Sequence, residues 1–100
     1  YEDCFAEPLR WHMRPGSLLI AISSSGNSPN IINACLAARE LGGFLITLSA
    51  MRPDNAIRTL GDLNFYLPAP TYSLAESAHA AVLHHWLDSA VAMGDKNLVV

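Results

Sequence analysis

The chain has 100 residues, of which 51% are hydrophobic and only 15% charged, with a formal net charge of −3. This length suits one small domain, and the high apolar content with little net charge excludes an intrinsically disordered protein. The six lysines and arginines are scattered and form no basic stripe, which argues against a protein that binds nucleic acid through charge.

Neither a membrane span nor a signal peptide is expected. The longest apolar runs, such as residues 18–22 and 44–46, are far shorter than the roughly 20 residues of a transmembrane helix. The chain begins with Tyr1 and not Met, which suggests a fragment or a processed chain. Cys4 and Cys35 lie far apart without metal-binding spacing, so we expect two reduced, buried thiols in a cytoplasmic protein.

Helical patterns and short apolar runs alternate along the chain. Apolar runs bounded by turn residues predict strands that are buried on both faces. The predicted elements are, in order, a helix over 2–13, a strand over 18–22, a helix over 29–41, a strand over 44–48, a short helix over 53–60, a strand over 63–67 and a helix over 73–93. This order predicts an α/β fold with a parallel sheet flanked by helices. Because three strands make a thin sheet, we expect a further strand and its helices outside this chain or from another subunit.

The loop after the first strand is rich in serine and runs into a helix start, where Ser28 is expected as the N-cap and Pro29 as the first residue. A free helix N-terminus, four hydroxyls and a glycine would form an uncharged cradle for a phosphate group. The hydroxyls are those of Ser23, Ser24, Ser25 and Ser28. The loop lacks the Gly-Lys-Ser/Thr of a nucleotide P-loop and the glycine spacing of a dinucleotide site. The alternative is an ordinary serine-rich turn before a capped helix.

Residues 20–28, Ile-Ala-Ile-Ser-Ser-Ser-Gly-Asn-Ser, resemble the phosphosugar-binding signature of sugar isomerase (SIS) domains. Residues 30–32, 37–38, 42 and 46–48 and the last helix resemble the phosphoheptose isomerase branch of that family. The resemblance implies an SIS-type, flavodoxin-like three-layer sandwich, of which residues 1–100 form the C-terminal part. It also implies that the four serines bind the phosphate of a sugar phosphate.

The predicted last helix carries Glu76, His79, His84 and His85. At about 100° per residue, Glu76 and His84 lie about 80° apart around the helix axis and about 12 Å apart along it. The small Ala80 lies between them, whereas His85 falls on the side opposite Glu76. One site can therefore use Glu76 and His84 together.

The resemblance assigns roles to these two residues. It implies that His84 is the catalytic histidine of an aldose–ketose isomerisation, and that Glu76 occupies a position where phosphoheptose isomerases have a glutamine that contacts substrate or a bound metal. The carboxylate departs from that pattern, which puts the identity of the substrate in doubt. Zinc is possible by resemblance, with Glu76 and His84 as ligands, although the sequence itself requires no cofactor. The alternative for His84 is a structural histidine.

Other residues of the last helix are assigned structural roles. His79 is expected as a packed or hydrogen-bonded histidine, and His85 and His12 as structural histidines. Four apolar residues are expected in the core or a subunit interface, namely Val82, Leu83, Trp86 and Leu87. Tyr72 is a weaker candidate to line the sugar pocket.

These observations predict a phosphosugar isomerase acting on a sugar phosphate such as sedoheptulose 7-phosphate. The resemblance further implies a homo-oligomer, dimeric or tetrameric, without direct contact to nucleic acid or membrane. In the family, a second acid–base Glu, a metal-ligating His and a first strand precede this segment. The main alternative is a non-catalytic SIS module that binds a sugar phosphate or bridges proteins, as the replication-initiator-associating relatives do. A weaker alternative is an amino-sugar phosphate isomerase or lyase.

Overall fold

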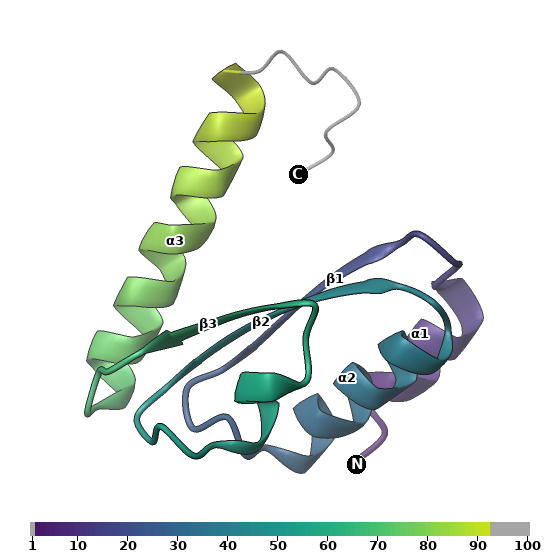
Figure 1. The fold of residues 1–100 in the computed structure, drawn as a ribbon, viewed down its shortest axis with the longest axis horizontal. Coiled ribbons are helices and arrows are strands. Elements are labelled where there is room, and N and C mark those ends of the chain that lie inside the picture. Colours follow the sequence, from purple (N-terminus) through teal and green to yellow (C-terminus); the bar gives the residue numbers. More distant parts are fainter. Residues whose placement is uncertain (1, 93–100) are drawn as a thin grey trace.

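A computed structural model describes residues 2–92, which form a three-stranded parallel sheet with helices on both faces. The strands, in the spatial order β1-β2-β3, are β1 (Leu18–Ser23), β2 (Phe44–Ala50) and β3 (Leu63–Leu67). On one face lie α1 (Ala6–His12), α2 (Pro29–Glu40) and the 3₁₀ helix η1 (Ala56–Thr59), and on the other lies α3 (Tyr72–Ala92) (Figure 1). The predicted parallel α/β sheet between two helical layers is confirmed.

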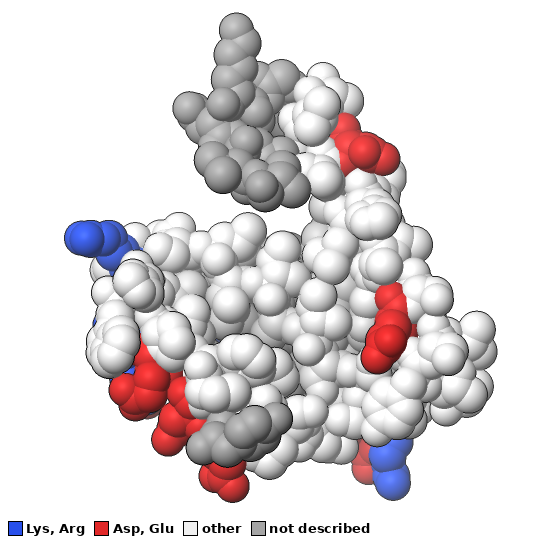
Figure 2. Space-filling view, turned by 180° about the vertical axis from the view of Figure 1, so that it is seen from behind, with Lys and Arg blue, Asp and Glu red and all other residues white. Residues whose placement is uncertain are grey.

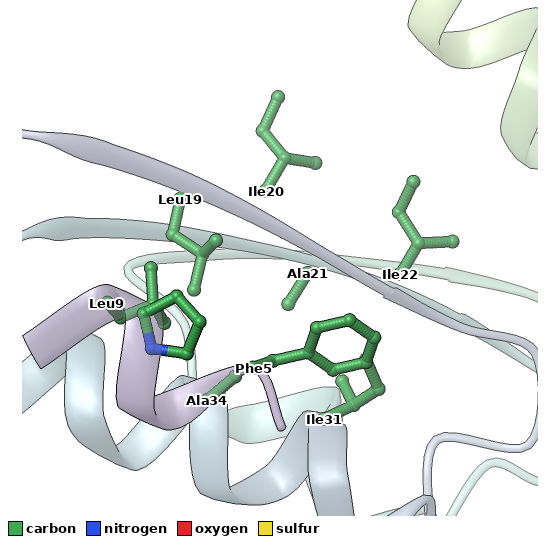
Figure 3. Close-up of a pocket in the computed structure, with 9 residues that line it drawn as sticks. Phe5, Leu9, Leu19, Ile20, Ala21, Ile22, Ile31 and Ala34 are labelled. Carbon is green, nitrogen blue, oxygen red and sulfur yellow. The ribbon is translucent and has the colours of Figure 1, made fainter. Parts of the chain in front are cut away.

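Side chains of β1 alternate between the two faces of the sheet. Leu19 and Ala21 point toward α1 and α2, whereas Ile20 and Ile22 point to the opposite face (Figure 3). The core on the α2 side consists of Ala21, Cys35, Leu45 and Ile57. The strands are therefore apolar on both faces, as their continuous apolar runs predict.

The sheet face that carries α3 is only partly covered. There Leu48 is fully buried, and Phe65 makes an edge-on contact with Trp86 of α3 at 5.3 Å between ring centroids. Leu18, Phe44 and Leu63, which belong to the same face by the sheet register, are each about half exposed. Figure 2 shows a broad surface beside α3 without charged side chains. An uncovered apolar face fits the expectation that further elements complete this sheet.

The boundaries of two predicted helices differ from the observed ones. Residues 2–5 form turns ahead of α1, and there the Asn33 side chain donates hydrogen bonds to the Glu2 carbonyl and the Asp3 carboxylate at 3.2 and 3.3 Å. Such tertiary contacts override a helical pattern. The helix predicted from residue 53 begins only at Ala56, because the Asn55 side chain caps it. The predicted end of the last helix, at Met93 and Gly94, lies outside the described residues.

The two cysteines differ in their surroundings. Cys35 on α2 is fully buried, and this burial raises the pKa of its thiol to about 11. Cys4 is exposed in the turn before α1, so the prediction that both thiols are buried is wrong for Cys4. The turn that contains Cys4, residues 2–5, runs over the surface of α2 and contributes no side chain to the hydrophobic core.

None of the helices within residues 2–92 combines the length and apolarity needed to cross a bilayer.

Candidate functional site

Two pockets stand out in the described part of the chain. One has a volume of about 350 Å³ and lies along β1 beside α1 and α2, and its lining includes Phe5, Leu19 and Ile31 (Figure 3). All its lining side chains are apolar, so it offers no side-chain hydrogen bond to orient a substrate. The other pocket, of about 340 Å³, lies at the carboxyl end of β1. It is lined by Ile22, Ser23, Ser24, Ser25, Ser28, Tyr72 and Glu76, and we call it the serine pocket.

The serine pocket lies where open α/β sheets bind their ligands, outside the carboxyl ends of the strands. Its loop, residues 23–28, turns at Gly26, whose φ of +71° is in the left-handed region. The Gly26 N–H donates to Ser23 Oγ at 3.0 Å, and that Oγ lies 3.2 Å from Ser28 Oγ. Ser23 is buried, so its hydroxyl shapes the loop from within.

Three backbone donors from neighbouring elements hold the serine loop in place. The N–H of Ala50, at the end of β2, donates to the Ser24 carbonyl at 3.1 Å. From η1, the Ile57 N–H donates to the Gly26 carbonyl at 3.0 Å, and the Ala56 N–H donates to the Asn27 side chain at 2.9 Å. The loop is therefore fixed before any ligand arrives.

Asn55 packs against the serine loop, a role that was not predicted from the sequence. Its side chain is buried, donates from Nδ2 to Ser49 Oγ at 3.0 Å and accepts at Oδ1 from the Arg58 N–H at 3.0 Å. It also packs so closely on Gly26 that a Cβ added there would lie 2.1 Å from its Cγ. An asparagine before a short helix is an N-cap signal, but only the fold shows that it touches the loop.

The N-terminus of α2 remains open toward the pocket. Ser28 is the N-cap, as predicted, but its hydroxyl pairs with Ser23 and makes no capping hydrogen bond. The backbone N–H groups of Ser25 and Ser28 have no acceptor within residues 2–92. Ser25 Oγ accepts from the Asn27 N–H at 3.2 Å, which leaves its own proton free to donate. Unsatisfied donors and the helix dipole together favour an anion here.

From α3, Tyr72 and Glu76 complete the wall opposite the serines. Among the described residues that line the pocket, Glu76 alone is charged. An anion in the cradle would therefore share the pocket with a carboxylate. The structure thus brings together five of the predicted site residues, Ser23, Ser24, Ser25, Ser28 and Glu76.

His84 does not join this group in the described structure. It is exposed on α3, about two turns beyond Glu76, and it does not line the serine pocket. Within residues 2–92, no three His, Cys, Asp or Glu side chains gather closely enough to hold a metal ion. Glu76 and His84 would supply two of the four ligands that a zinc ion normally takes.

The remaining histidines of the sequence analysis have separate surroundings. His79 is 2% exposed and its Nε2 lies 3.0 Å from the Ser49 carbonyl, which confirms a packed, hydrogen-bonded histidine. His85 on α3 and His12 at the end of α1 are both exposed. The Trp86 ring packs edge-on against Phe65, but within residues 2–92 it is only partly buried, as are Val82, Leu83 and Leu87, so none of the four belongs to the buried core described here.

Comparison with known proteins gives a consistent family of relatives, although no protein-family model matches the chain. The chain is 35% identical over 86 residues to a phosphoheptose isomerase of Aromatoleum aromaticum and 33% identical over 84 residues to one of Rhodospirillum rubrum. Each match covers 84% of this chain and 43% or 44% of the relative. The chain thus spans less than half the length of these curated relatives.

Solved structures agree with the sequence matches. A phosphoheptose isomerase from Neisseria gonorrhoeae is similar with a TM-score of 0.79 and 30% identity, over 88% of this chain and 50% of that one. One from Francisella tularensis has a TM-score of 0.81 over 87% of this chain and 47% of that one, and at 22% identity it supports the fold alone. The predicted resemblance is confirmed in both sequence and fold.

Proposed function

We propose that this chain, which is related to the phosphoheptose isomerases over 84% of its length, is the C-terminal part of an SIS domain that isomerises a sugar phosphate. The single observation that carries the proposal is the serine pocket, in which four hydroxyls, the open N-terminus of α2 and Glu76 line one cavity. The best specific substrate is a ketose phosphate such as sedoheptulose 7-phosphate, which would become the aldose phosphate.

The pocket has two chemically different sides, and these set the direction in which a substrate binds. The serine loop offers only neutral donors, which suit a phosphate dianion. Glu76 carries negative charge on the opposite side and would repel that phosphate. We therefore propose that the phosphate lies on the loop and that sugar hydroxyls donate hydrogen bonds to Glu76.

The reaction moves a proton between two neighbouring carbons. A base removes the proton from the carbon beside the carbonyl while the carbonyl oxygen takes up a proton, which gives an enediol. The hydroxyl on the first carbon then loses its proton as the other carbon is protonated, so that the carbonyl has moved by one carbon. We propose His84 as this acid–base group, since an imidazole titrates near neutral pH. Because His84 lies beyond the pocket lining, the substrate would extend from the loop past Glu76 along α3.

Metal and partners follow from the same proposal. Zinc would be held by Glu76 and His84 together with ligands from outside this chain, and it would polarise the substrate carbonyl as a Lewis acid. The half-exposed apolar residues of the sheet support a homo-oligomer or a larger domain. Cys4 and Cys35 are both free thiols, which supports a reducing compartment such as the cytoplasm.

The test is isomerisation of sedoheptulose 7-phosphate by the full-length protein and two variants. We expect His84→Asn to lower kcat by about 10²–10⁴-fold, the usual contribution of a general acid or base. His85→Asn, on the other side of the helix, is the matched control and should change kcat little. A larger loss from His85→Asn than from His84→Asn would contradict the proposed site.

The second candidate is a non-catalytic module that binds a sugar phosphate or bridges proteins. Two observations favour it: His84 lies outside the serine pocket, and a glutamate occupies position 76. The module would bind sedoheptulose 7-phosphate in calorimetry without turning it over, and neither His84→Asn nor His85→Asn would change that binding.

A further inference from the structure

His79 is the one buried histidine in the described part of the chain, and its hydrogen bonding is asymmetric. Its Nε2 lies 3.0 Å from the Ser49 carbonyl. A carbonyl can only accept, so Nε2 donates this hydrogen bond. The Nδ1 of the same ring is buried without a partner. Within residues 2–92, the bond from Nε2 to Ser49 is thus the hydrogen bond that holds this imidazole.

Because His79 lies on α3, its hydrogen bond to Ser49 can fix the position of the helical turn to which it belongs. Of the 21 residues of α3, the buried ones are Ala75 and His79, which lie one turn apart. Glu76 lies between them in the sequence and projects into the serine pocket. Farther along, α3 rises away from the sheet (Figure 1). Apart from the partly exposed contact of Trp86 with Phe65, the attachment of α3 to the sheet is therefore concentrated in the turn that carries Glu76.

Ser49, the partner of His79, also supports the serine loop. Its carbonyl faces His79, and its hydroxyl accepts the Nδ2–H of Asn55 at 3.0 Å. Asn55 in turn packs against Gly26 of the loop. The same residue of β2 thus joins the helix that carries Glu76 to the loop that carries the serines.

We propose that His79 is a positioning residue, which holds Glu76 at a fixed distance from the serine loop through its hydrogen bond to the Ser49 carbonyl. This inference rests on the proposed function, because it assigns Glu76 to the sugar. Among the described residues, His79 is hydrogen-bonded to Ser49 and to no residue of the serine loop, and it does not line the pocket. Its substitution should therefore disturb the sugar side of the site and leave the phosphate side intact.

The experiment is a double-mutant cycle in the full-length protein, which isolates the coupling between two residues. We expect His79→Leu to lower kcat/KM for sedoheptulose 7-phosphate by about tenfold or more, the effect of a small misplacement at a reacting centre. Inorganic phosphate should bind at least as tightly as in the wild type, because the serine loop is unchanged and Glu76 only repels the anion. Glu76→Ala should then cost little in the His79→Leu background, although it costs much in the wild type.

His79→Gln is the matched rescue variant, because a glutamine amide can place its nitrogen near the position of Nε2 and donate to the Ser49 carbonyl. It should recover most of the kcat/KM lost in His79→Leu. If thermal unfolding shows that His79→Leu does not fold, His79→Asn takes its place, since its shorter amide reaches less far toward Ser49.

Two outcomes would overturn the inference: additive losses for His79→Leu and Glu76→Ala, or a glutamine variant as impaired as the leucine variant. The proposed function fails by a different result, in which Ser25→Ala and His84→Asn leave phosphate binding and turnover unchanged. In that case neither half of the site is used, whatever the coupling between His79 and Glu76.

Discussion

Gly26→Ala should destabilise the protein more than a backbone argument alone predicts. A left-handed φ of +71° costs a residue with a Cβ roughly 1–2 kcal/mol. In addition, the new Cβ would lie 2.1 Å from Asn55 Cγ, so the buried asparagine has to move. Asn55 then loses its hydrogen bonds to Ser49 Oγ and the Arg58 N–H, each worth about 1 kcal/mol. The expected loss of unfolding free energy is roughly 3–4 kcal/mol.

Gly16→Ala is the control that separates the cost of backbone strain from the cost of the steric clash with Asn55. Gly16 has a similar φ of +86°, but a Cβ there would meet no atom within 4 Å. Its substitution should cost only the backbone term of roughly 1–2 kcal/mol. Urea denaturation of the full-length variants, followed by circular dichroism, gives both free energies on one scale.

A second background tests the cause directly. In an Asn55→Gly protein the space beside Gly26 is empty, so Gly26→Ala should then cost no more than Gly16→Ala. The reasoning is refuted if Gly26→Ala and Gly16→Ala are equally destabilising in the wild type, because the contact with Asn55 would then carry no energy.

Four further predictions concern the pocket and the thiols. Ser25→Ala should weaken inorganic phosphate binding by roughly 1–2 kcal/mol in calorimetry without changing stability, whereas the buried Ser23→Ala should also lower the unfolding free energy; equal stability losses would contradict this division. Glu76→Gln should tighten inorganic phosphate binding by about threefold to tenfold at low salt, and this gain should shrink at high salt; a salt-independent gain would exclude repulsion. Cys4 should react with a thiol reagent in the folded protein and Cys35 only after unfolding. Because its pKa is raised to about 11, Cys35 favours the fold below pH about 9, and this contribution should be lost as the pH rises toward 11, except in Cys35→Ala.

The strands and the loop could be predicted because they depend on local patterns. The apolar run Leu18–Ile22, bounded by turn residues, identifies β1, and Ser28-Pro29 identifies the start of α2. The serine pocket follows, because a loop between a strand end and a helix start has one place in a parallel sheet.

Contacts between distant residues could not be predicted in this way. From the sequence, Asn55 is typical of a turn and Ser49 of a strand. In the structure they are hydrogen-bonded to each other, and Asn55 packs on Gly26. Gly26 lies 29 positions before Asn55 and 23 positions before Ser49 in the chain. Helical spacing placed Glu76 and His84 on neighbouring faces, but it could not show that only Glu76 reaches the loop. That distinction depends on where α3 meets the sheet, which is set by Ala75 and His79.

The fastening of the serine loop to β2 and η1 also has a kinetic consequence. Because Ala50, Ala56 and Ile57 already hold the loop in shape, capture of a phosphate requires no rearrangement of its backbone. Association should then be limited by the diffusional encounter, and substrates of different sugar length should arrive with similar on-rates. Different sugars would then differ in their residence times, because these depend on the contacts that each sugar makes with the part of the cavity lined by Glu76.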